Sequence, residues 1–173
     1  MVGVKVKIYT LDVSKAIGVD FSTQNIAIAL VSSEQGIEKT FQKKLDGTKK
    51  LGTEGLLCQA FDEAVDVFEN KLKNELNGVP VYIEKPFGWR NHHTTILLSQ
   101  ISGIILGVAH SYGFRSKLVA NTTWKKVVGG KPTKEDTQRW VSFMYGLDDI
   151  TEHQCDAIGI ASYGLNVLNE LLE

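Results

Sequence analysis

Hydrophobic residues recur along the chain in short runs that are rich in β-branched side chains and separated by small polar links. Three such runs come early, over residues 16–20, 25–32 and 36–44. The links between them are so short that we expect an antiparallel meander of three strands. Ahead of them, apolar and polar residues alternate over residues 1–13, as in a half-buried strand. We therefore expect an N-terminal extension, residues 1–15, that forms either an extra strand or an addition outside the sheet.

The rest of the chain alternates strands with helices. Apolar residues at helical or strand spacing predict the following elements in order: a helix over 53–76, a strand over 80–84, a helix over 96–109, a strand over 115–120, a short helical piece over 122–128, a helix over 133–145 capped by Thr133, and a helix over 152–172. This order predicts an α/β fold with a mixed five-stranded sheet, three strands antiparallel and the later ones parallel, flanked by helices. We expect residues 16–173 to form a single domain.

Charge gives only a weak indication of the partner. The net charge is −1 and the isoelectric point is about 6.4, whereas proteins that bind nucleic acids are usually basic. The basic residues are clustered, however, at Lys43–Lys44, Lys49–Lys50, residues 90–93 and residues 125–139. A basic face on a nearly neutral chain is still compatible with binding a polyanion.

Neither the cysteines nor the apolar stretches indicate a secreted or membrane protein. Cys58 and Cys155 have no metal-binding or disulfide spacing, so we expect two free thiols in a reducing compartment. The apolar stretch over 101–109 is too short to span a bilayer, and the first residues lack the apolar core of a signal peptide. We expect a cytoplasmic protein with no membrane partner.

Three acidic residues and one histidine stand at the ends of predicted elements. Asp20 ends the first strand of the meander, and Glu84 ends the strand over 80–84. Asp156 lies near the start of the last helix, and His153 lies three residues earlier on the same helix face. These elements can bring all four side chains to one end of the sheet. Oxygen ligands of this kind suit Mg²⁺ or Mn²⁺, and an imidazole favours Mn²⁺.

Such a cluster would suit phosphodiester hydrolysis with two metal ions. Two ions about 3.5–4 Å apart can activate a water and stabilise the leaving oxygen, and several carboxylates are needed to balance their charge. We expect Asp20 to bridge the ions and Glu84 to hold one of them. Asp156 and His153 would hold the other, unless His153 instead orients the attacking water.

Four segments of the chain resemble motifs of one family. Residues 17–22 are similar to the opening I-G-[IV]-D-P-[GS] of the RuvC-like Holliday-junction resolvases, and residues 81–84 to their second motif, an apolar strand that closes on glutamate. Residues 153–161 resemble the closing [DH]-x-x-D-A-[LI]-[AG]-[IV]-A, in which the family carries either Asp or His at the place of His153. Residues 127–131 with Lys134 resemble the V-x-G-x-G…K segment. Phe21 stands where the family usually has proline.

The resemblance covers about residues 16–165 and implies a ribonuclease H-like fold. It also implies a homodimeric endonuclease that uses divalent metal ions to make paired nicks across four-way DNA, with Asp20, Glu84, His153 and Asp156 as its catalytic and metal-binding residues. A small resolvase without further modules resembles a phage-type member, encoded by a phage and acting in a bacterial host.

Further residues are candidates for contact with branched DNA. Phe87 and Trp89 follow Glu84 in a loop, where they either stack on unpaired bases at a junction or pack beneath the loop. Arg90 is placed to contact phosphates. Four lysines are either backbone phosphate contacts or part of a solvated helix face, namely Lys125, Lys126, Lys131 and Lys134. Trp124 and Trp140 are assigned to packing.

The helix over 96–109 bears on assembly, since it is apolar on nearly all sides and contains Ser102, Gly103 and Gly107. It is therefore either a buried core helix or the face of a homodimer.

Three alternatives stand beside the resolvase hypothesis. One keeps the fold but changes the substrate to a flap, a general branch or an RNA:DNA hybrid. A non-catalytic DNA-binding module is disfavoured because all four candidate metal ligands are present. An ATP-handling half of an actin-like fold would need a second similar domain and a glycine-rich phosphate loop, for which 173 residues leave no room.

Overall fold

The structure, a computed structural model, describes residues 14–75, 78–88, 91–129 and 132–170. Its centre is one sheet with the strand order β3-β2-β1-β4-β5. The strands are β1 (Lys15–Phe21), β2 (Asn25–Ser32), β3 (Gly36–Lys44), β4 (Pro80–Lys85) and β5 (Arg115–Ala120). β1, β2 and β3 pair antiparallel, whereas β4 pairs parallel with both β1 and β5. The predicted sheet is thus confirmed. The predicted strand within residues 1–13 lies outside the described residues.

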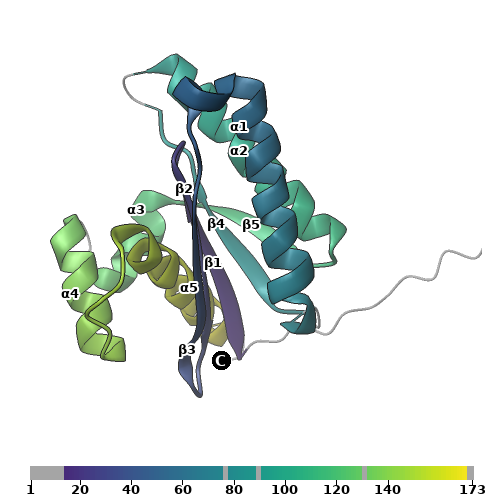
Figure 1. Cartoon of the computed structure of the whole chain (residues 1–173). Coiled ribbons are helices and arrows are strands. Elements are labelled where there is room, and N and C mark those ends of the chain that lie inside the picture. The colour runs from purple at the N-terminus through teal and green to yellow at the C-terminus, as the bar shows by residue number, and fades with distance from the viewer. Residues whose placement is uncertain (1–13, 76–77, 89–90, 130–131, 171–173) are drawn as a thin grey trace, which may run out of the picture.

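Helices cover both faces of the sheet (Figure 1). The helical elements are α1 (Thr48–Val65), η1 (Asp66–Lys71), η2 (Lys73–Glu75), α2 (His92–Ser111), α3 (Asn121–Trp124), η3 (Lys125–Val128), α4 (Lys134–Tyr145) and α5 (Glu152–Glu170). α1 and α2 lie on one face, and α4 and α5 lie on the other (Figure 1). The predicted α/β class, a ribonuclease H-like mixed sheet between helices, is confirmed.

Strand β1 presents side chains of different size to the two faces of the sheet. Large residues such as Ile17, Val19 and Ile83 point toward α1 and α2. On the other face β1 presents Ala16 and Gly18 to α5. A Cβ added at Gly18 would lie 2.0 Å from the carbonyl oxygen of Ala157 in α5. The backbone of α5 therefore lies directly against β1, closer than ordinary side chains would allow.

The helix predicted over residues 53–76 differs from the structure at both ends, and α2 is longer than the predicted 96–109. α1 starts at Thr48, but Gly52 has a φ of 69° and separates a first turn from the helix that follows. The regular part thus begins at the predicted residue 53. The predicted single helix to residue 76 is wrong beyond Val65, where a π-helical segment takes over at Asp66. α4 agrees with the prediction, since Thr133 caps it in a reciprocal capping box with Asp136.

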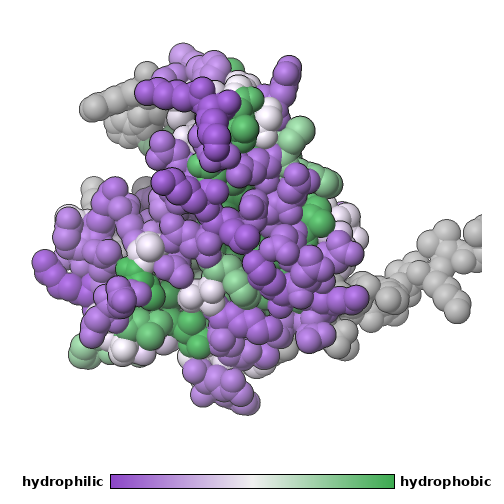
Figure 2. All heavy atoms as spheres, in the orientation of Figure 1, coloured by the Kyte–Doolittle hydropathy of each residue, from purple (hydrophilic) through white to green (hydrophobic). Residues whose placement is uncertain are grey.

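α2 combines a buried and an exposed face. It is the one helix among the described residues that is long and apolar enough to cross a membrane, with a mean hydropathy of 1.3. Leu97, Ile101 and Ile105 on its inner face are nevertheless core residues packed against the sheet. A core helix of a water-soluble domain meets the same criteria. The molecular face seen in Figure 2 is mostly hydrophilic, and its apolar atoms gather in small groups.

Candidate active site

The parallel pairing of β1 with β4 places two carboxylates side by side. Val19 is in register with Ile83, so Asp20 and Glu84 take the next register position at the carboxyl ends of both strands. Side chains alternate between the faces of a strand. Asp20 therefore shares the α5 face with Gly18, and Glu84 shares it with Tyr82. Two strands far apart in the chain thus direct acidic groups to one edge of the sheet.

The start of α5 supplies the other candidate residues and is anchored at several points. The Thr151 hydroxyl accepts a hydrogen bond from the backbone N–H of Gln154 at 3.2 Å, and the Gln154 side chain accepts one from the Thr151 N–H at 3.1 Å. The same two residues also bind the edge strand β3, where Thr151 donates to Gln42 and Gln154 donates to Thr40. These bonds hold the first turn of α5, which carries His153, against the sheet.

Asp20 and His153 are in direct contact. Nδ1 of His153 lies 2.6 Å from Oδ2 of Asp20, and only 7% of Asp20 is exposed. The hydrogen bond to Asp20 raises the pKa of His153 above its usual value, although burial opposes the shift. Residues 133 positions apart are thus brought together, as the sequence analysis expected.

Glu84 and Asp156 are close enough to Asp20 for its charge to affect both. Burial, reinforced by the negative charge of Asp20, raises the pKa of Glu84. The same two causes raise the pKa of Asp156 to about 7, and Glu84 adds to this shift. Lys125 opposes the shift at both carboxyls. Three carboxyl groups therefore share a partly buried region in which their negative charges repel one another.

Glu84 is held by two residues that the sequence analysis did not assign to the site. Nδ2 of Asn121 donates to one carboxylate oxygen at 2.9 Å, and Nε1 of Trp124 donates to the other at 3.1 Å. Trp124 is fully buried, so its assignment to packing was right but incomplete. A buried indole N–H usually needs a hydrogen-bond partner. This requirement was the feature of the sequence that could have indicated a polar partner for Trp124. Asn121 directly follows the last residue of β5. Because β5 pairs parallel with β4, Asn121 lies beside the end of β4.

The carboxylate oxygens of this cluster are ligands that suit a hard divalent cation. Their side chains are, however, not arranged around a single point. Among the described residues, no three His, Cys, Asp or Glu side chains are arranged to hold a single ion. In this arrangement Asp20 binds His153, and both oxygens of Glu84 accept N–H groups. Each carboxylate oxygen keeps a further lone pair for a cation. A cation would also relieve the repulsion that raises the pKa of Glu84 and Asp156.

The predicted phosphate-binding lysines occupy different environments. Lys125 acts electrostatically on Glu84 and Asp156, and its Nζ lies 5.3 Å from the centre of the Trp124 ring. Lys134 forms a 2.7 Å ion pair with Glu152 at the start of α5. Lys126 instead lines a separate cavity beside α5. Lys125 therefore faces the carboxylates and Lys126 does not. Lys131 lies outside the described residues.

Phe87 lies in the loop after β4 and lines the same pocket as Glu84. Its side chain is 72% exposed, which does not fit burial beneath the loop. The following Gly88 packs tightly on α2, because a Cβ added there would lie 2.3 Å from the hydroxyl oxygen of Thr95. The predicted DNA-binding residues Trp89 and Arg90 lie outside the described residues.

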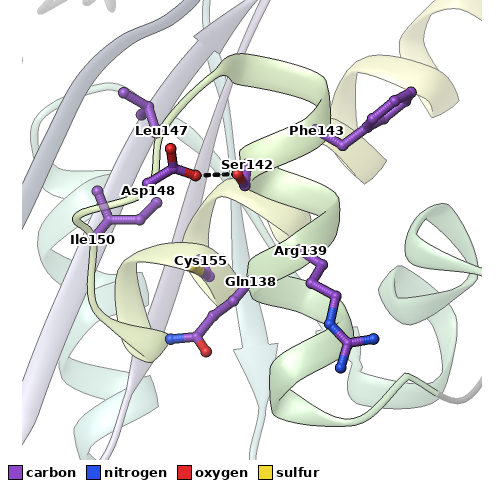
Figure 3. Close-up of a pocket in the computed structure, with 8 residues that line it drawn as sticks. All are labelled: Gln138, Arg139, Ser142, Phe143, Leu147, Asp148, Ile150 and Cys155. Carbon is purple, nitrogen blue, oxygen red and sulfur yellow. Dashed lines mark hydrogen bonds between the residues drawn. The ribbon is translucent and has the colours of Figure 1, made fainter.

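A cavity of about 480 Å³ between α4 and the loop to α5 is separate from this cluster (Figure 3). It is lined by Gln138, Arg139, Ser142, Phe143, Leu147, Asp148, Ile150 and Cys155. Ser142 donates a hydrogen bond to Asp148 across it (Figure 3). Burial raises the pKa of the Cys155 thiol to about 11, so the thiol stays protonated at neutral pH and is a poor nucleophile. Cys58 and Cys155 are both free, as predicted.

The fold is similar to that of two solved structures from Thermus thermophilus. RuvC in complex with a Holliday junction substrate matches with a TM-score of 0.71 and 14% sequence identity, covering 91% of this chain and 95% of that one. A second RuvC structure matches with a TM-score of 0.69 and 16% identity, covering 91% and 96%. No family model and no curated protein matches the sequence. At these identities the likeness establishes the fold, and membership of the RuvC-like family stays a prediction.

Replacing Trp124 by phenylalanine should weaken the site through Glu84. The variant keeps an aromatic ring in the core but removes the N–H donor, so the pKa of Glu84 should rise further. If these residues cleave a phosphodiester with Mg²⁺, the Mg²⁺ concentration for half-maximal cleavage should increase about 10-fold, the usual scale for losing a residue that orients a metal ligand. The acidic limb of the pH–rate profile should move to higher pH. Trp140→Phe, the same change in α4, should leave both measurements unchanged.

Asp156→Asn should stabilise the metal-free protein at high pH. Burial and Asp20 raise the pKa of Asp156 to about 7, above its ordinary value of 3.8. Between these values the folded protein retains a proton that the unfolded chain releases, so stability falls as pH rises and the full penalty is present above about pH 7. We expect the variant to gain about 1–3 kcal/mol over the wild type between pH 4 and pH 8. Urea unfolding in EDTA measures the difference, and a constant difference across this range would contradict the assignment.

Proposed function

We propose that this protein is a divalent-metal-dependent endonuclease that cuts four-way or otherwise branched DNA. The observation that carries the proposal is the meeting of Asp20, Glu84, Asp156 and His153 at one edge of a RuvC-like sheet. The similar RuvC from Thermus thermophilus was solved with a Holliday junction substrate. We retain the prediction that the protein works inside the cell.

Asp20, Glu84 and Asp156 are the proposed metal ligands, with His153 as a fourth ligand or as the group that orients the attacking water. Two Mg²⁺ or Mn²⁺ ions bound there would supply an activated water and stabilise the leaving oxygen of the phosphodiester. The residues of the chain prepare this site in two ways. Asn121 and Trp124 fix the orientation of Glu84, and Asp20 fixes that of the His153 ring.

Lys125 contributes to the proposed site as a fixed positive charge. It faces the carboxylates, so it is placed to attract the phosphate that has to approach three acidic groups. Phe87, exposed beside Glu84, is placed to stack on an unpaired base. Lys126, Lys134, Lys131, Trp89 and Arg90 are retained as proposed DNA contacts.

Paired nicks require two active sites related by a two-fold axis, so we propose a homodimer. The outer surface of α1 and α2 is the best candidate interface. It exposes 50% of Phe61 and 61% of Ile96, and a Cβ added at Gly103 or Gly107 would meet no atom within 4 Å. Small residues of this kind let a second helix approach closely. α2 would then be both a core helix and a dimer face, which unites the two readings of its sequence.

Parallel cleavage assays test the proposed function. A synthetic four-way junction, a flap, a linear duplex and an RNA:DNA hybrid are incubated with the protein in Mg²⁺ and in Mn²⁺. We expect symmetric paired nicks in the junction, no product in EDTA and far slower cleavage of the duplex. Cleavage of the hybrid alone would replace branched DNA by RNA:DNA hybrids as the substrate. The absence of cleavage on all four substrates in both metals would refute the nuclease.

A further inference from the structure

Two rows of side chains cross the sheet beneath the first turn of α5. In the first row, Asp20 of β1 is in register with Ala27 of β2, and Ala27 is in register with Gln42 of β3. The neighbouring row consists of Gly18, Ala29 and Thr40. Residues directly opposite one another on paired strands point to the same face of a sheet. Gln42 therefore shares the α5 face with Asp20, although it lies two strands away on the edge strand β3.

The residue in the middle of each row is small, which lets α5 lie across the row. Ala27 and Ala29 are fully buried and belong to the same core cluster as the buried residues of α5. Their methyl groups fill little of the space between helix and sheet, so the helix approaches closely. The first turn of α5 therefore reaches from Asp20 to Gln42, and the groups at these two ends determine where it lies.

Three hydrogen bonds between side chains tie this turn to the sheet within the described residues. They join His153 to Asp20 and Thr151 to Gln42 at the two ends of the first row, and Gln154 to Thr40 in the neighbouring row. Gln42 uses both ends of its amide, because Oε1 accepts from Thr151 while Nε2 donates to Oδ1 of Asn25 at 3.0 Å. Helix ends fray easily. The bond to Gln42 therefore supports the turn at the end of the row opposite to His153.

We propose that Gln42 is a positioning residue for His153 and acts through Thr151 on the first turn of α5. The proposal rests on the proposed nuclease function and adds to it a residue from outside the cluster of candidate ligands. Asp20 holds the ring of His153, whereas a functional side chain also needs a backbone that is held in place. Gln42 binds Thr151 and Asn25, so its effect on the site travels through α5. A shift of about 1 Å in such a group is enough to lower a rate strongly.

Histidine-ring ¹⁵N NMR of the metal-free protein tests the positioning without relying on cleavage. The chain has four histidines, and His153→Gln identifies the signals of His153. Gln42→Leu keeps the side chain similar in size but removes both of its hydrogen bonds, so the His153 signals should shift or broaden while those of the other histidines stay unchanged. Gln59→Leu is the matched control, because Gln59 of α1, on the opposite face of the sheet, accepts a 2.9 Å hydrogen bond from the Asp46 N–H. It should leave the signals of every histidine unchanged.

Junction cleavage separates positioning from DNA binding. For Gln42→Leu we expect kcat to fall about 10-fold with an unchanged KM for the junction, the usual scale for losing a residue that orients a functional group. Gln59→Leu should keep both values. Thr151→Val removes the same bond from its other partner, together with the cap of α5, so adding Gln42→Leu to it should cost little more. Thr151→Ser keeps the hydroxyl and should recover most of the rate that Thr151→Val loses. Thermal melts check that each variant is folded.

The outcomes separate this proposal from the nuclease itself. If the His153 signals of Gln42→Leu match those of the wild type, Gln42 does not position His153 and the nuclease stands. A loss confined to KM would mean that Gln42 contacts the DNA instead. If the losses of Gln42→Leu and Thr151→Val multiply in the double variant, the two residues act independently and the proposed route through Thr151 is wrong. If the wild type cuts no junction, the proposed function fails, and the NMR comparison still decides whether Gln42 holds His153.

Discussion

Replacing Asp20 by asparagine should lower the rate of junction cleavage by about 10²-fold or more, which corresponds to a barrier increase of about 2.7 kcal/mol. Asp20 is the most interconnected residue of the site. Only 7% of Asp20 is exposed. Its carboxylate contacts His153, and its charge acts on both Glu84 and Asp156. Asparagine has nearly the same shape but carries no charge to hold a cation.

The same substitution should not destabilise the fold. Removing the charge of Asp20 relieves the repulsion that raises the pKa of Glu84 and Asp156, so metal-free Asp20→Asn should unfold at an equal or higher urea concentration than the wild type. Single-turnover cleavage with excess protein measures the chemical effect. Asp46→Asn, at an exposed carboxylate paired with Lys50, is the control. A rate for Asp20→Asn within threefold of the wild type would exclude Asp20 as an essential metal ligand.

The strands and the candidate acidic residues at their ends could be recognised in the sequence because both depend on local pattern. β-Branched runs with short links predicted the meander, and β5 was predicted with its observed limits, Arg115–Ala120. Asp20 and Glu84 were recognisable because each follows an apolar strand. Their adjacency was not recognisable from local pattern alone. It depends on the parallel register of β1 with β4, which pairs segments more than sixty residues apart.

The residues that surround the candidate site were harder to predict from the sequence. They depend on the direction in which each helix points its side chains and on contacts between residues far apart in the chain. Asn121 and Trp124 lie 37 and 40 residues from Glu84 in the sequence. Lys125 and Lys126 are neighbours, yet they face different sides, because both lie in the 3₁₀ helix η3, where successive side chains point about 120° apart. No periodicity over so few residues predicts which lysine faces the carboxylates. The kink at Gly52 depends likewise on one residue with a positive φ.

The motif resemblance has a physical basis in close packing. The closing motif places small residues on the face of α5 that meets the sheet and Trp124. A Cβ added at Gly159 would lie 2.7 Å from the Trp124 ring, so this glycine makes room for the indole that holds Glu84. Gly18 in the opening motif similarly makes room for α5. The small residues of both motifs thus set the spacing between the elements that carry the acidic residues.

Gly18→Ala should therefore be among the most damaging single-methyl substitutions in the chain. The added Cβ would lie 2.0 Å from the oxygen of Ala157 and 2.4 Å from the nitrogen of Ala161. Both are backbone atoms of α5, so no side chain can rotate away and the helix itself has to move. We expect the free energy of unfolding to fall by about 3 kcal/mol, at the upper end for overpacking a core.

A matched glycine-to-alanine substitution elsewhere and a cleavage assay distinguish this clash from a general effect of replacing glycine by alanine. Gly103→Ala in α2 adds the same methyl where no atom lies within 4 Å, and it should leave the stability unchanged or raise it by up to about 1 kcal/mol, since alanine favours helix. Urea unfolding at micromolar concentration compares the two. Any Gly18→Ala protein that still folds should also cut junctions more slowly, because Ala157 adjoins Asp156, and moving α5 outward separates Asp156 from Asp20. Wild-type stability for Gly18→Ala would mean that α5 does not lie against β1, and the proposed spacing of the carboxylates would then have no structural basis.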